Sequence, residues 1–91
     1  MTYDQSDLQP ICRRALDTYG QKAQIDQCIE EMAELTVELQ HAKRDRDHHA
    51  DEEVADVLIC VLQMRILAGE ERVDAQIKRK LARLEQRMSE I

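Results

Sequence analysis

Residues 51–68 read DEEVADVLICVLQMRILA, and this segment decides the fold. Apolar side chains occupy nearly the whole circumference of a helix built from it, and a helix of that kind is buried. Gly69 follows directly and is a suitable helix stop. A chain of 91 residues is too small to enclose such a helix well, so we expect a second subunit to cover part of it.

The chain before this segment predicts further helices. Two glycines, one proline and no tryptophan or phenylalanine leave few turns and no aromatic sheet core. Apolar residues recur at steps of three and four over 6–19 and 22–42, with Ser6 as the first N-cap. Residues 43–51, KRDRDHHAD, contain no large apolar side chain and predict a solvated connection.

The last predicted helix, 71–88, carries a narrow apolar seam. Its spacing is close to a heptad repeat, so pairing with another helix is expected; the seam consists of Val73, Ile77, Leu81, Leu84, Met88 and Ile91. We therefore expect a single all-α domain over residues 1–91, an antiparallel bundle of about four helices completed by oligomerisation. The expected assembly is a homodimer or a dimer-of-dimers tetramer.

Charge and cysteine content exclude several classes of protein. The net charge of −6 disfavours a nucleic-acid polymer as partner. Three distant cysteines without a Cys-x-x-Cys pattern argue against a disulfide framework or a structural zinc site, and predict reduced, buried thiols. The first residues lack an apolar signal region, and no apolar run is long enough to cross a bilayer. These features predict a cytoplasmic protein that has no membrane partner.

Acidic residues gather in 26–56, and basic residues in 78–87, a distribution that suits metal ions and phosphates together. A solvated, salt-bridged helix surface gives the same distribution. Within the acidic part, Glu31 and Glu34 form one pair three residues apart, and Glu53 and Asp56 form another. Each pair shares one helix face.

Asp56 lies inside an apolar run, where an ionised carboxylate needs a cation or a proton. If the two pairs face each other, their hard oxygen ligands select Mg²⁺, with Mn²⁺ as a substitute, over zinc. The alternative is that each pair lies on a solvated helix surface, and that Glu53, in the first turn of its helix, interacts favourably with the helix dipole.

Glu30-Glu31-x-x-Glu34-Leu35 followed by Glu53-x-x-Asp56-Val57-Leu58 resembles the signature of MazG-like nucleoside triphosphate pyrophosphohydrolases and the related all-α dUTPases. The Tyr19-Gly20 and Gln24-Ile25 steps, and the spacing of Ile77, Lys80-Leu81, Leu84 and Arg87, are also similar to family segments. The resemblance covers the chain roughly from Tyr19 onward.

The resemblance implies that a nucleoside triphosphate is hydrolysed to its monophosphate and pyrophosphate by attack of water at the α-phosphorus. It makes Glu31, Glu34, Glu53 and Asp56 the Mg²⁺ ligands, with Glu34 and Glu53 as catalytic residues. Further residues would bind the substrate: Lys80 the phosphates, and Gln24 and Tyr19 the base. Two of them have a plainer reading, Lys80 as a solvated cation and Tyr19 as cover for the apolar side of the first helix.

Two non-catalytic alternatives remain open. A helical homo-oligomeric interaction module explains the heptad-like seam and gives no reason for Asp56 in an apolar helix. A nucleotide-binding module without turnover retains all four presumed ligands. Magnesium binding separates the first alternative from a hydrolase, and pyrophosphate release separates the second.

Overall fold

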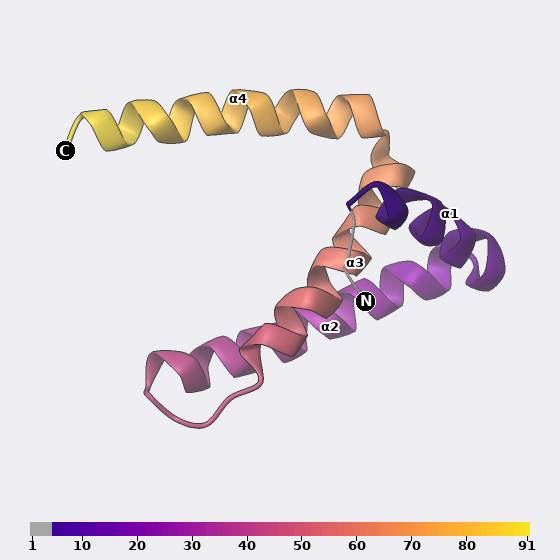
Figure 1. Ribbon diagram of the computed structural model, residues 1–91, viewed down its shortest axis with the longest axis horizontal. Coiled ribbons are helices and arrows are strands. Elements are labelled where there is room, and N and C mark those ends of the chain that lie inside the picture. The colour runs from indigo at the N-terminus through magenta and orange to yellow at the C-terminus, as the bar shows by residue number, and fades with distance from the viewer. Residues whose placement is uncertain (1–4) are drawn as a thin grey trace.

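A computed structural model describes residues 5–91, and over this range it consists of one short 3-10 turn and four α-helices without a strand. The elements are η1 (Gln5–Asp7), α1 (Leu8–Tyr19), α2 (Gln21–Lys43), α3 (Ala50–Ala68) and α4 (Glu70–Ser89), as Figure 1 shows. The all-α class and all four predicted helical segments are confirmed. The first helix begins later than predicted, because its N-cap residue is Asp7 and not Ser6. Within 5–91, no helix combines the length and apolar character that crossing a membrane requires.

Two glycines divide the helical chain. Gly20 and Gly69 have φ values of 91° and 105°, a region that residues with a Cβ rarely adopt. Each closes the preceding helix, since Gly20 N donates to Leu16 O at 2.9 Å and Gly69 N donates to Arg65 O at 3.0 Å. The next helix begins at the following residue in both cases, so the glycines set abrupt changes of direction.

The connection between α2 and α3 is solvated, as predicted, and it is fastened to the start of α3. Glu38 Oε2 accepts a hydrogen bond from His49 N at 2.7 Å. His48 Nδ1 accepts one from Ala50 N at 3.2 Å. These side chains satisfy backbone donors that the first turn of a helix leaves unpaired. The connection returns the chain so that α3 runs antiparallel to α2.

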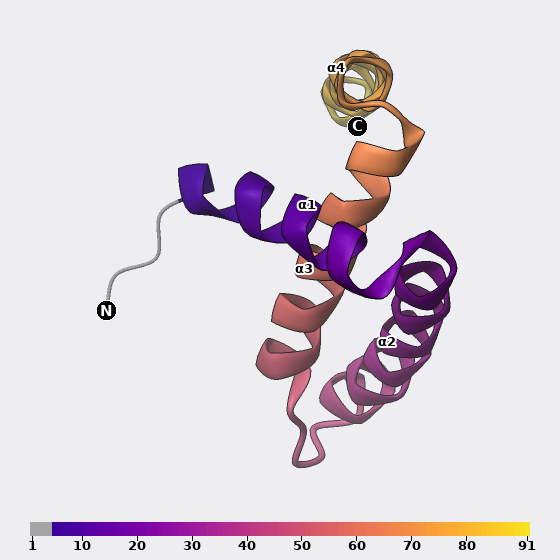
Figure 2. The same cartoon turned by 90° about the vertical axis from the view of Figure 1, so that its right-hand side faces the viewer.

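The core lies where α1, α2 and α3 meet (Figure 2). Its buried apolar side chains are Cys12 and Leu16 from α1, Cys28 from α2 and Cys60 from α3. All three cysteines are buried, as predicted, and none is paired with another. Cys12 Sγ donates a weak hydrogen bond to Ile59 O at 3.7 Å.

A single chain leaves part of α3 uncovered, as the length of the chain led us to expect. Leu58 is 57% exposed, and Val54 and Val61 are exposed as well. The reason is geometric, because α1 and α2 cover only part of the circumference of α3 and no other described element covers the rest. At Gly69 the chain turns away, and α4 projects from the body instead of packing along α3 (Figure 1).

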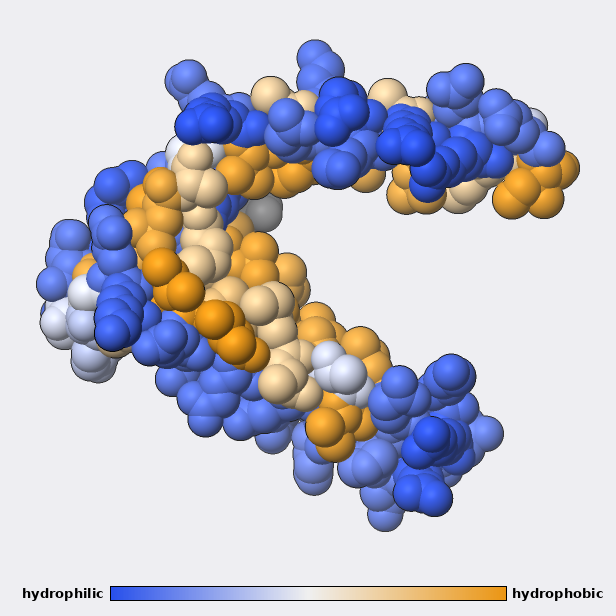
Figure 3. Space-filling view, turned by 180° about the vertical axis from the view of Figure 1, so that it is seen from behind, coloured by the Kyte–Doolittle hydropathy of each residue, from blue (hydrophilic) through white to orange (hydrophobic). Residues whose placement is uncertain are grey.

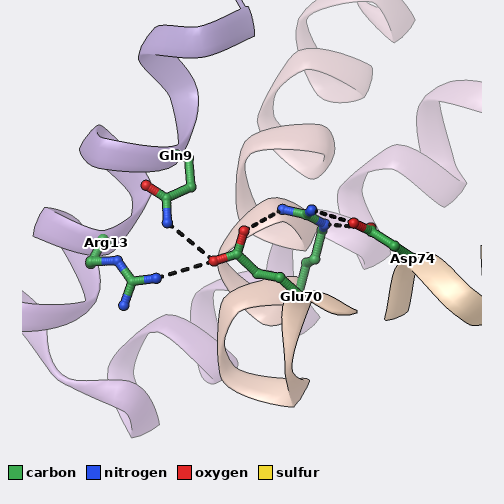
Figure 4. A network of polar contacts seen from close by, with 5 residues as sticks. Gln9, Arg13, Glu70 and Asp74 are labelled. Carbon is green, nitrogen blue, oxygen red and sulfur yellow. Dashed lines mark hydrogen bonds and ion pairs between the residues drawn. The ribbon is translucent and has the colours of Figure 1, made fainter. Parts of the chain in front are cut away.

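A network of polar side chains fixes the bend between α3 and α4. Arg65 binds Asp74 through two parallel hydrogen bonds of 2.8 and 2.7 Å, and it reaches Glu70 Oε2 at 2.9 Å. Glu70 Oε1 accepts further bonds from Gln9 Nε2 and Arg13 Nη2, each at 3.1 Å (Figure 4). The network therefore ties α4 to both α1 and α3, and the hydrogen bonds from Arg65 lower the pKa of Asp74.

We predict that Asp74→Asn destabilises the protein near neutral pH, and that the loss shrinks in acid. A lowered pKa in the folded chain means that the ionised form contributes stability, which disappears as the pH falls from the ordinary value of 3.8 through the lowered one. Melting temperatures of the variant and the parent, measured across this range, test the prediction. Glu71→Gln is the matched control, because the described residues show no ion pair for Glu71. An identical deficit at every pH would contradict the role of the Arg65–Asp74 pair.

Candidate metal centre

Three carboxylates meet where α2 packs on α3. Glu31 and Glu34 come from α2 and Glu53 comes from α3, and one oxygen of each lies within 4.8 Å of the others. The spacing of three residues places Glu31 and Glu34 on one face of α2, as predicted. Because α3 runs antiparallel, its first turns bring Glu53 against that face. We call Glu31, Glu34 and Glu53 the acidic cluster.

Two oxygens of the acidic cluster are buried without a hydrogen-bond partner among the described residues, namely Glu31 Oε2 and Glu53 Oε2. Glu31 Oε1 accepts a bond of 2.6 Å from Gln27 Nε2, which fixes this carboxylate in place. Glu34 is exposed, so the cluster opens to solvent on one side. Buried carboxylate oxygens without donors need a cation or a proton.

Glu53 experiences electrostatic repulsion from the acidic residues around it. Burial raises the pKa of Glu53, and the negative charges of Glu34, Glu31 and Asp56 raise it further. No lysine or arginine within residues 5–91 forms an ion pair with the acidic cluster to offset this repulsion. The arrangement therefore favours a bound cation, or failing that a proton on Glu53.

Asp56 lies next to the acidic cluster but outside the group of mutually close oxygens. It is one turn beyond Glu53 on α3, and its charge reaches Glu53. The expectation that Asp56 is buried is wrong in the single chain, because the side of α3 that carries it stays open to solvent. Three of the four predicted ligands are brought together, and Asp56 borders them.

Lys80 lies apart from the other two predicted substrate-binding residues, Tyr19 and Gln24. Tyr19 is exposed at the end of α1, and Gln24 is half-buried near the start of α2. Lys80 is exposed on α4, which leaves the opposite end of α3 from Glu53 (Figure 1). One chain therefore does not bring Lys80 to the acidic cluster.

Gln63 is a buried polar residue that the sequence analysis missed. Its side chain is 4% exposed, and Gln63 Oε1 has no hydrogen-bond partner among the described residues. The available signal was an amide inside the apolar run 57–68, where a polar side chain needs a partner.

The thiols adjoin the acidic cluster without joining it. Burial raises the pKa of Cys60, and the neighbouring Cys28, Glu31, Asp56 and Cys12 raise it further. Burial also raises the pKa of Cys12. Because metal binding to sulfur requires the thiolate, these raised values disfavour a soft-metal site in the core.

The donor set therefore fits a hard divalent cation. The acidic cluster offers carboxylate oxygens alone, without a histidine or cysteine ligand, and such a set suits Mg²⁺ or Mn²⁺. Comparisons of the chain with family models, with curated proteins and with solved structures each found no match. The chain's own residues consequently carry the functional inference.

We predict opposite effects of Glu53→Gln with and without magnesium. In chelator, the variant should melt above the parent, because the substitution removes one of the repelling charges. The raised pKa of Glu53 means that the parent loses stability as the pH rises from the ordinary value of 4.5 through the raised one. The difference in melting temperature between the variant and the parent should therefore widen over that interval.

With magnesium at about 100 times its dissociation constant, the parent should gain roughly 2.7 kcal/mol and the variant much less. Thermal melts with and without magnesium measure both effects. Glu30→Gln, which neutralises an exposed acid beside Glu31, is the control and should respond to magnesium like the parent. If magnesium raised the melting temperatures of the parent and of Glu53→Gln equally, the acidic cluster would not be the metal site.

Proposed function

We propose that this chain is a magnesium-dependent nucleoside triphosphate pyrophosphohydrolase, which hydrolyses a (deoxy)nucleoside triphosphate to the monophosphate and pyrophosphate. The observation that carries the proposal is the convergence of three carboxylates from two antiparallel helices, with two buried oxygens left unpartnered. The resemblance of the two acidic motifs to the MazG-like signature supports the same conclusion.

Glu31, Glu34 and Glu53 would hold Mg²⁺ or Mn²⁺, and Asp56 would complete the set from the next turn of α3. When bound, the ion neutralises charge on the phosphate oxygens and lowers the pKa of an attacking water. Gln27 holds the Glu31 carboxylate in its orientation through the 2.6 Å hydrogen bond. Ligands fixed in this way spend little energy on reorganisation during the reaction.

Glu34 is our choice for the general base. It is the exposed member of the acidic cluster, so its carboxylate meets water while Glu31 and Glu53 are partly buried. Glu34 would accept the proton of the water that attacks the α-phosphorus, and pyrophosphate would leave. Glu53 would contribute its carboxylate from α3, opposite Glu31 and Glu34 of α2.

The triphosphate also requires positive donors. We assign this role to Lys80, and base recognition to Gln24 and Tyr19. Because α4 carries Lys80 away from the acidic cluster of its own chain, the assignment requires a homodimer or a dimer-of-dimers tetramer in which another chain supplies Lys80. The three unpaired thiols suit a reducing compartment, so we place the protein in the cytoplasm.

We predict that Glu53→Gln or Asp56→Asn reduces pyrophosphate release by more than roughly 100-fold, because loss of even an outer partner of a metal ligand commonly costs 10–100-fold. The measurement is pyrophosphate release over a panel of natural and modified nucleoside triphosphates. Helical content, followed by circular dichroism, should stay unchanged. Glu30→Gln is the control and should retain activity. Full activity in either cluster variant would refute the ligand assignment.

The exposed apolar surfaces of α3 and α4 favour a second candidate, a non-catalytic helical homo-oligomeric interaction module or nucleotide-binding module. Titration calorimetry separates these candidates. A hydrolase or a nucleotide-binding module should release or absorb heat with magnesium, and Glu53→Gln should abolish that signal. A pure interaction module should give no magnesium signal in either protein. Binding of nucleotide and magnesium without pyrophosphate release would identify the nucleotide-binding module.

A further inference from the structure

The chain exposes more surface than a folded protein of its mass should. Its accessible area is 7609 Å² for 10.6 kDa, whereas a compact monomer of this size exposes about 5,500 Å². Its radius of gyration is 15.6 Å, against about 12 Å for a compact chain of this length. The excess, roughly 2,100 Å² by the same scaling, needs a cover.

One side of the α2–α3 hairpin is apolar and open. On α3, Val54, Leu58 and Val61 follow at steps of four and three, which places them on one stripe, and all three are exposed. On α2, Met32 and Leu39 are exposed a full heptad apart. We call these five residues the hairpin apolar face. Figure 3 shows hydrophobic residues along the inside of the bend between α4 and the rest of the chain.

The acidic cluster lies on the other side of the same hairpin. At about 100° per residue, Glu34 and Met32 point to opposite flanks of the α2 surface that faces α3. Asp56 and Val61 are likewise separated across the buried side of α3, which is marked by Cys60. A partner on the hairpin apolar face therefore leaves the acidic cluster accessible to solvent.

The second uncovered surface is the seam of α4. Ile77, Leu81, Leu84 and Met88 are each about half exposed, and α4 has no buried residue. The seam continues through Val73 into a hollow of about 240 Å³ at the bend, lined by Val61, Leu62, Met64, Arg65, Ala68 and Val73. The α4 seam and the hairpin apolar face therefore border one apolar concavity.

We propose that a second copy of this chain fills the concavity, with α4 of each copy lying on the hairpin apolar face of the other. The α4 of the same chain is held away, because Gly69 turns it outward and the Arg65–Asp74–Glu70 network fixes the bend. One chain therefore carries both the α4 seam and the hairpin apolar face but cannot pack one on the other. In a two-fold symmetric dimer, each α4 seam packs on the hairpin apolar face of the other chain.

The area that a pair would bury agrees with a second copy. If both copies bury their excess, the pair covers about 4,200 Å², which is within the range of obligate homodimers. This interface does not rest on the proposed hydrolysis. Because it lies on the side of the hairpin away from the acidic cluster, it does not itself bring Lys80 to that cluster, and the Lys80 assignment would need the second dimer of a tetramer.

We predict that sedimentation equilibrium of the full chain at micromolar concentration gives a dimer or a multiple of it. Leu58→Asp on the hairpin and Leu84→Asp on α4 should each weaken association by roughly 100-fold or more, since each places a charge in the desolvated centre of an interface. Val37→Asp is the matched control. Val37 is 52% exposed on the side of α2 opposite Cys28, and its substitution should leave association unchanged.

An equimolar mixture of Leu58→Asp and Leu84→Asp chains gives the sharper test. A heterodimer of the two keeps one unaltered contact, between the α4 of the first chain and the hairpin of the second. The mixture should therefore form heterodimers, and should regain helical content if either variant alone unfolds. A monomeric parent, or a mixture that does not associate, would overturn the proposal. Dimers of Leu58→Asp alone would show that α4 pairs with α4, and dimers of Leu84→Asp alone that hairpin pairs with hairpin, and either result would also overturn it.

Discussion

The packing of α2 against α3 must hold two opposed features in the same few turns. Cys28 and Cys60 are buried between the helices and stabilise the contact, while Glu31 and Glu53, close by on the same two helices, bring like charges together. The antiparallel return after Lys43 makes both features unavoidable, because the register that joins the thiols also joins the acids. Sites that store repulsion in this way reduce the stability of the empty protein in favour of a ligand.

Much of the architecture follows from local sequence. Steps of three and four, together with Gly20 and Gly69, predicted all four helices to within about two residues, as is usual for strongly periodic segments. The pairing of Glu31 with Glu34 followed from helix geometry alone. The approach of Glu53 to them was only a condition in the sequence analysis, because it depends on how α3 packs against α2.

The remaining features depend on contacts between distant parts of the chain. Periodicity shows how many sides of α3 are apolar, but it does not show which element covers them. Asp56, which lies in an apolar run of the sequence, is therefore exposed in the single chain. The direction of α4 depends on bonds from Gln9 and Arg13 to Glu70, more than fifty residues away, which no local pattern contains. Gln63 was missed because one amide in an apolar run does not disturb the periodicity.

A core built from three thiols, one on each of three helices, also changes how the protein would respond to chemistry. An electrophile reaches Cys12, Cys28 or Cys60 only while a helix has separated from its neighbours, so the rate of alkylation reports how often the body opens. A modified sulfur is too large for the space it left, because close-packed interiors do not absorb added volume. The same small side chains that let the helices approach closely would then hold them apart.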